Sequence, residues 1–97
     1  KKYYAITAGK KGVFWIENGK IFNCKPPNKK VVETNCAGDV FHGAFAAFIH
    51  QKYSIIDSMR FATATASLKC MKNGGIYSIP NFSSVKSFVK KIQLRKL

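Results

Sequence analysis

The 97-residue sequence predicts an α/β fold in which strands come first and helices follow, packed on the sheet. Short aromatic and β-branched runs fill the first part of the chain, and apolar residues at helical spacing fill the rest. The chain is also 46% hydrophobic and 13% aromatic, so it carries the apolar surface that a disordered basic tail lacks. A single small domain spanning residues 1–97 accounts for this length.

Three strands are predicted in the N-terminal part. Residues 3–7 (YYAIT) and 13–16 (VFWI) are apolar runs separated by a glycine-bounded turn, so we expect two adjacent strands, the first of them buried. The dipeptide Asn18-Gly19 is a strong hairpin signal, and it leads into a third strand at residues 21–22. After a connector rich in Pro and Lys, residues 31–32 (VV) are expected to form a further brief strand.

Three helices are predicted in the remainder. Residues 38–50 are apolar on nearly every side, which predicts a buried helix. Ser54 and Asp57 have the spacing of a capping box, so a second helix begins there and runs to about Lys72. It is expected to end at Gly74-Gly75, where glycine supplies the positive φ of a C-cap. A last, amphipathic helix is predicted from the apolar residues Phe82, Val85, Phe88, Val89 and Ile92.

The composition excludes several classes of protein. No apolar run approaches the roughly 20 residues that span a bilayer, and the first residues lack the pattern of a signal peptide. Three cysteines, none in a CxxC pair, predict a reducing compartment, hence a cytoplasmic protein, and no zinc site. His42 and His50 lack the spacing of a metal pair, so we expect them in the core or at its edge.

The start of the sequence favours a segment of a longer chain. No initiator Met is present, and the first strand follows at once without a cap or loop. A processed small protein would also lack its Met, so both interpretations stay open.

The scarcity of acids allows a general base to be sought by elimination among four carboxylates. Asp57 is assigned to a helix start and Glu17 flanks the turn, which leaves Glu33 and Asp39. A helix N-terminus has unpaired N–H groups and about half a positive charge, so Asp39 would lie beside a bound anion. There it could take a proton from an incoming hydroxyl. The alternative is that Thr34 or Asp39 simply caps the helix.

Residues 33–45 (ETNCAGDVFHGAF) resemble the signature D-T-x-G-A-G-D-x-F-x-G-A of the ribokinase-like (PfkB-type) carbohydrate kinases. Residues 6–13 (ITAGKKGV) resemble the family's T-x-G-x-x-G nucleotide loop, and residues 72–80 (KNGGIYSIP) its glycine turn and S-x-P stretch. The resemblance covers essentially the whole chain, but only the C-terminal third of such an enzyme. It implies the C-terminal portion of a ribokinase-like (Rossmann-like) fold.

The resemblance implies ATP-dependent phosphorylation of a sugar or sugar-like hydroxyl, with Mg²⁺ on the phosphates. Asp39 would contact the sugar and act as general base, with the anion hole formed by the backbone of Cys36, Ala37 and Gly38. The nucleotide site would comprise Thr7, Ala8, Gly9, Lys10, Lys11, Gly12, Gly38 and Thr63. The monovalent-cation site, in relatives that use K⁺, would comprise Glu33, Asn35, Lys69, Lys72, Gly74 and Ser78.

Two residues depart from the family signature. Glu33 replaces the usual Asp and adds a methylene that could displace the cation site. Cys36 replaces the first Gly of G-A-G-D and would narrow the anion hole. A cysteine at a helix N-terminus has a favoured thiolate, which raises a secondary hypothesis of oxidation sensitivity; the alternative is an inert small residue.

Two other functions compete with the kinase. The net charge of +13 and a pI near 10 suit a nucleic-acid-binding module. However, 15 of the 17 cations are Lys and they are dispersed in pairs, so we expect neither a nucleic-acid nor a membrane partner. A non-catalytic kinase remnant is the other alternative. Because the family's sugar contacts lie mostly outside this segment, the isolated chain is expected to be inactive; a homodimer of the full-length enzyme is a further candidate assembly.

Overall fold

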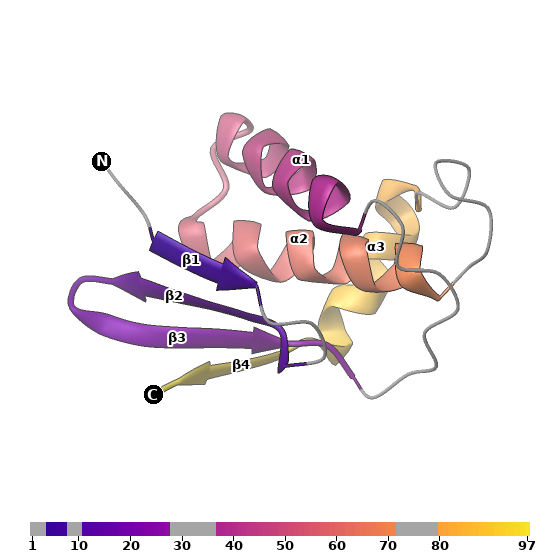
Figure 1. Cartoon of the computed structure of the whole chain (residues 1–97). Helices are drawn as coiled ribbons and strands as arrows, with labels where there is room; N and C mark the ends of the chain where they lie inside the picture. The colour runs from indigo at the N-terminus through magenta and orange to yellow at the C-terminus, as the bar shows by residue number, and fades with distance from the viewer. Residues whose placement is uncertain (1–3, 8–10, 28–36, 72–79) are drawn as a thin grey trace.

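The computed structural model describes residues 4–7, 11–27, 37–71 and 80–97, which form an antiparallel sheet with helices over one face (Figure 1). In chain order, the elements are β1 (Tyr4–Thr7), β2 (Val13–Glu17), β3 (Lys20–Lys25), α1 (Ala37–His50), α2 (Ile55–Cys70), α3 (Phe82–Phe88), the 3₁₀ turn η3 (Val89–Lys91) and β4 (Gln93–Lys96). The predicted brief strand at residues 31–32 lies outside the described residues.

The strands lie side by side in the order β1-β2-β3-β4, and each pairs antiparallel with the next. The expected hairpin between β2 and β3 is confirmed, with Glu17 opposite Lys20. Its two central residues, Asn18 and Gly19, have φ of 54° and 75°. Positive φ at both positions is the requirement of a type I′ turn, whose twist matches that of the flanking strands.

The final strand corrects the expectation that strands come only first. Gln93–Lys96 adds to the edge of the sheet, with Leu94 opposite Cys24 and Arg95 opposite Asn23. All four of its residues are exposed. Its sequence, QLRK, therefore has no need of the apolar alternation from which a strand is predicted, and it shows none. The last helix is correspondingly shorter than expected, because α3 ends at Phe88 and continues only as the 3₁₀ turn.

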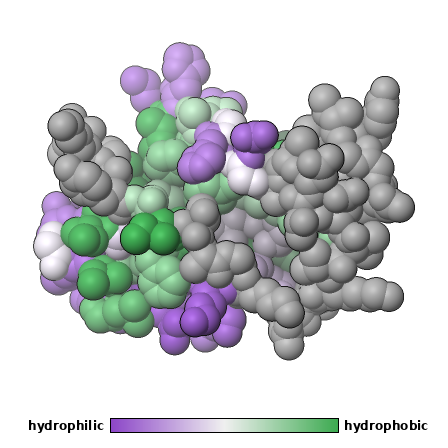
Figure 2. Space-filling view, in the orientation of Figure 1, coloured by the Kyte–Doolittle hydropathy of each residue, from purple (hydrophilic) through white to green (hydrophobic). Residues whose placement is uncertain are grey.

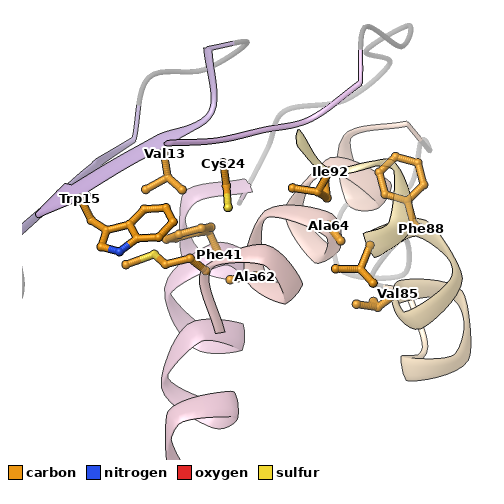
Figure 3. Close-up of a cluster of buried hydrophobic side chains, with 11 residues drawn as sticks. Val13, Trp15, Cys24, Phe41, Ala62, Ala64, Val85, Phe88 and Ile92 are labelled. Carbon is orange, nitrogen blue, oxygen red and sulfur yellow. The ribbon is translucent and has the colours of Figure 1, made fainter. Parts of the chain in front are cut away.

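The core lies between the sheet and the helices (Figure 3). The strands contribute Val13, Trp15 and Cys24, each at most 1% exposed. The helices and the following turn contribute Phe41, Met59, Ala62, Ala64, Val85, Phe88, Val89 and Ile92. The small side chains of Ala62 and Ala64, which are fully buried, let α2 approach its neighbours closely.

An aromatic cluster connects the C-terminal part of α1 with α2 and the start of α3. Phe48 of α1 lies 5.0 Å from Phe61 of α2 and 5.3 Å from Tyr53 in the connecting turn, measured between ring centroids. Phe82, at the start of α3, lies 6.0 Å from Phe61. Aromatic pairs at these separations add about 0.5–1.5 kcal/mol beyond their buried area, so the three helices are held together here.

Two expectations of burial are wrong. Ile6 of β1 is 70% exposed, and Ile16 and Ile21 form an exposed cross-strand pair on the sheet face away from the helices. Figure 2 shows hydrophobic surface over the strands. Helix α1 buries Phe41 and Phe48 but exposes Ala46 and Ala47, because its neighbours cover only one side of it.

The predicted start of α2 is confirmed, and the helix ends at Cys70, within two residues of the predicted end at about Lys72, but without the predicted glycine C-cap. Ser54 Oγ accepts a hydrogen bond of 3.0 Å from the backbone N–H of Asp57, as an N-cap does. The Asp57 carboxylate lies 3.8 Å from Arg60 Nη1. The C-cap is Met71, in right-handed conformation with φ −83°, rather than a glycine with positive φ. Residues 74 and 75 lie outside the described residues.

We predict that Gly12→Ala lowers the free energy of unfolding by more than about 2 kcal/mol. Gly12 has φ +86°, and a Cβ there would stand 1.9 Å from the Cys24 carbonyl oxygen. Gly19→Ala is the matched control, since Gly19 has φ +75° but no atom within 4 Å of the added Cβ. The control should cost about 1 kcal/mol. Urea unfolding of both variants measures the difference, and equal losses would contradict the collision with β3.

Candidate active site

The first turn of α1 is the most open part of the predicted site. The helix begins at Ala37, and both Gly38 and Asp39 are exposed. A Cβ built on Gly38 would meet no atom within 4 Å. No described residue crowds Gly38 at the positive end of the helix, where a ligand could reach the backbone N–H groups.

Asp39 makes no hydrogen bond or ion pair with the part of the chain that the structure describes. Two other carboxylates have partners, since Glu17 accepts from the Trp15 indole at 3.2 Å and Asp57 lies beside Arg60. A capping bond from Asp39 to a described residue is thus not observed, and Thr34, the other candidate cap, lies outside the described residues. Phe41, two residues further along, is only 7% exposed, so burial of the opposite helix face holds the Asp39 backbone in place.

The predicted nucleotide loop, residues 7–12, joins β1 to β2. Its described parts are Thr7 at the end of β1 and Lys11 and Gly12 before β2. In Figure 1, β1 ends at its right-hand end, and β2 and α1 each begin at their right-hand ends. Ala8, Gly9 and Lys10 lie outside the described residues.

Sequence reasoning missed one residue that holds this loop. The buried side chain of Asn23 in β3 donates hydrogen bonds to the carbonyls of Lys11 and Val13. No sequence signal marks it, because Asn23 belongs to none of the motifs above and a lone Asn in a strand run has no distinctive pattern.

Thr63 is assigned by the resemblance to the surroundings of adenine. The structure buries it in α2, where it is 5% exposed and its hydroxyl donates a 2.7 Å hydrogen bond to the Met59 carbonyl. That bond uses the hydroxyl proton, so only the lone pairs of the oxygen could meet another group. The contact with adenine stays a prediction.

Lys69 is the one member of the predicted cation site within the described residues, and it is fully buried in the last turn of α2. Its ammonium group would repel K⁺, so only its backbone carbonyl could serve as a ligand. The other members, and Cys36 of the anion hole, lie outside the described residues: Glu33, Asn35, Lys72, Gly74 and Ser78.

The described residues hold no group of three or more His, Cys, Asp or Glu that could bind a metal ion. His42 and His50, which we expected in the core or at its edge, are both exposed on α1. Across the same ranges, no helix has the length and apolar character needed to cross a membrane.

Cys24, whose backbone carbonyl lies next to Gly12, has a thiol with a raised pKa. It is fully buried, and this burial raises the pKa of the thiol to about 12, while the positive charge of Arg60 opposes the rise. The neutral thiol is favoured because charge is costly away from water. Cys24 is therefore a packing residue rather than a nucleophile at neutral pH.

This arrangement of sheet and helices is that of a ribokinase-like α/β kinase fold. The crystal structure of Thermotoga maritima ribokinase overlays with a TM-score of 0.83 at 31% identity, covering 92% of this chain and 30% of that one. Arabidopsis thaliana ribokinase, complexed with ribose and ATP, overlays with a TM-score of 0.82 at 35% identity, covering 92% and 29%.

Sequence comparison gives the same class. Ribokinase of Lactococcus lactis is 34% identical over 97 residues, which is 97% of this chain and 32% of that protein. The family model for the pfkB family carbohydrate kinases matches residues 1–81, so the chain belongs to this family. The chain spans about a third of the length of each of these three relatives.

We predict that iodoacetamide labels Cys24 at least about 100-fold more slowly than Cys70 in the native protein. With a pKa of about 12, only about one Cys24 thiol in 10⁴ is ionised at pH 8. Cys70 is partly exposed. Peptide mapping by mass spectrometry measures both rates, and unfolding in urea should make them converge. Equal native rates would show that Cys24 is not protected; labelling of Cys36 faster than both would support its oxidation sensitivity.

Proposed function

We propose that the protein containing these residues transfers the γ-phosphoryl group of ATP to a hydroxyl of a sugar or sugar-like substrate. The observation that carries the proposal is the first turn of α1. It presents an exposed carboxylate without a described partner, Asp39, next to an open glycine, and both belong to the family signature. Ribose and ATP, bound by the Arabidopsis relative, support sugar and nucleotide as the substrate classes.

The proposed chemistry assigns the proton to Asp39. Its carboxylate accepts the proton of the sugar hydroxyl as the hydroxyl oxygen forms a bond to the γ-phosphorus. The bond between that phosphorus and the bridging oxygen breaks, which releases ADP and leaves a sugar phosphate. An exposed carboxylate at the start of a helix can accept this proton because no described neighbour occupies its lone pairs.

The backbone at the start of α1 would stabilise the negative charge on the transferring phosphoryl group. The N–H groups of residues 36–38 would donate to its oxygens, aided by the positive helix terminus. Mg²⁺ would enter bound to the phosphates of ATP, as part of the substrate. When bound, it neutralises phosphate charge.

The resemblance also underlies several finer proposals. Relatives of this family differ in their sugar, and nothing in the described residues selects among ribose, other sugars and nucleosides. Binding of K⁺ at residues 33, 35, 69, 72, 74 and 78 stays a prediction, as do a cytoplasmic location and a homodimer of the full-length enzyme. We further propose that residues 1–97 alone have little activity, because the family's sugar contacts lie mostly elsewhere.

We predict that Asp39→Asn in the complete natural protein lowers kcat by about 10²–10⁴-fold, the usual contribution of a general base. Binding of ATP should change little, because the amide retains the size of the carboxylate and the helix N-terminus is unaltered. Asp57→Asn is the matched control, since Asp57 also lies in the first turn of a helix but belongs to α2. A coupled ADP-release assay with a panel of sugars measures turnover.

Near-normal turnover of Asp39→Asn would remove Asp39 as the base. A complete protein that phosphorylates no sugar in the panel, but shifts DNA or RNA with a steep dependence on salt, would favour the nucleic-acid alternative instead.

A further inference from the structure

Asn23 is a buried polar residue in the middle of β3, with 0% exposure. Its Cα partners are Phe14 of β2 and Arg95 of β4, so it lies at the centre of three adjacent strands. Burying a carboxamide without hydrogen bonds costs free energy, which means that such a residue must find partners for its donors and acceptors.

The donors of Asn23 reach the end of the predicted nucleotide loop. Nδ2 lies 3.0 Å from the carbonyl oxygen of Lys11 and 3.0 Å from that of Val13. These two residues flank Gly12, so one amide group joins the carbonyls of the residues before and after the loop's last glycine. Both of its N–H groups are used.

Gly12 is held from the other side by the backbone of the same strand. Its φ of +86° and the 1.9 Å separation between a built Cβ and the Cys24 carbonyl oxygen show that the backbone at Gly12 passes close beside that of Cys24 in β3. Neighbouring residues of one strand, Asn23 and Cys24, therefore fix the same tripeptide, one through hydrogen bonds and one through contact.

The acceptor of Asn23 is held by the last strand. Arg95 donates to Asn23 Oδ1 from Nη2 at 3.1 Å and from Nε at 3.4 Å. Carbonyl groups on one side and a guanidinium group on the other leave a single orientation for the amide. The interaction connects a residue near the end of the chain to the loop through one side chain.

We propose that Asn23, oriented by Arg95, is a positioning residue that fixes the backbone of residues 11–13 and so presents the loop to the phosphates or ribose of ATP. This inference rests on the proposed kinase function. Lys11 and Gly12, the described end of the loop, have no large apolar side chain that could anchor them in the core, so contacts with β3 hold their backbone.

The test uses the complete natural protein and compares variants of Asn23 and of Arg95, the two clamp residues, with a core variant. Asn23→Leu retains the size of the side chain and removes all four hydrogen bonds, whereas Arg95→Ala leaves the donors of Asn23 in place. Val85→Ala is the control: Val85 is buried in α3, so its truncation destabilises the core at a position outside the loop.

We expect Asn23→Leu to raise KM for ATP about tenfold, with KM for the sugar within about twofold, because a few lost hydrogen bonds correspond to such a change. Arg95→Ala should raise KM for ATP about threefold. Amide hydrogen exchange of residues 11–13 should quicken in both variants. Val85→Ala should lower the melting temperature but leave KM for ATP and this exchange unchanged.

The outcomes separate the two proposals. A wild-type protein that neither binds nor uses ATP overturns the proposed function and this inference with it. Wild-type activity combined with unchanged KM for ATP in both clamp variants overturns the positioning role alone. If Asn23→Leu fails to fold, Arg95→Ala decides, because Arg95 is exposed on the edge strand and its loss leaves the backbone pairing of β4 intact.

Discussion

The packing of one face of the β2–β3 hairpin against α2 is the constraint on which the rest of the structure depends. Val13, Trp15 and Cys24 are at most 1% exposed, and they belong to the same core cluster as the fully buried alanines of α2. Full burial of a large apolar side chain contributes about 1.5–3 kcal/mol, more than the about 0.5–1.5 kcal/mol net of one hydrogen bond. The core therefore sets where the strands and helices lie, and Phe41, inside it, sets where α1 begins.

Local contacts determine the backbone path of segments that place no side chain in the core. The loop between β1 and β2 has no large apolar side chain, and its path near β2 follows from Asn23 and the Cys24 carbonyl. Cys24 thus serves twice, since its side chain fills the core and its backbone limits Gly12. A neutral buried thiol suits this position because it packs without a charge that would need compensation.

Features with a local cause could be predicted from the sequence. The Asn18-Gly19 turn follows from the tolerance of both residues for positive φ, and the start of α2 follows from the Ser54 hydroxyl. Features that depend on distant partners could not. Strand β4 exists because β3 offers it an edge, and its own residues, QLRK, show no alternation. The exposure of Ile6 depends on what lies over the outer sheet face, which no local pattern encodes.

The candidate site divides in the same way. The signature around Asp39 could be identified because its chemistry requires particular residue types at fixed spacing, whereas Asn23 acts through hydrogen bonds to another strand. Asp39 is also exposed at the open end of α1. Proton transfer to a carboxylate during phosphoryl transfer requires that water be kept from the reacting atoms, since water would otherwise compete as the acceptor. Asp39 is exposed, so in the proposed reaction the substrate and the rest of the complete protein would have to exclude water there, which is the physical reason behind the proposal that these 97 residues alone have little turnover.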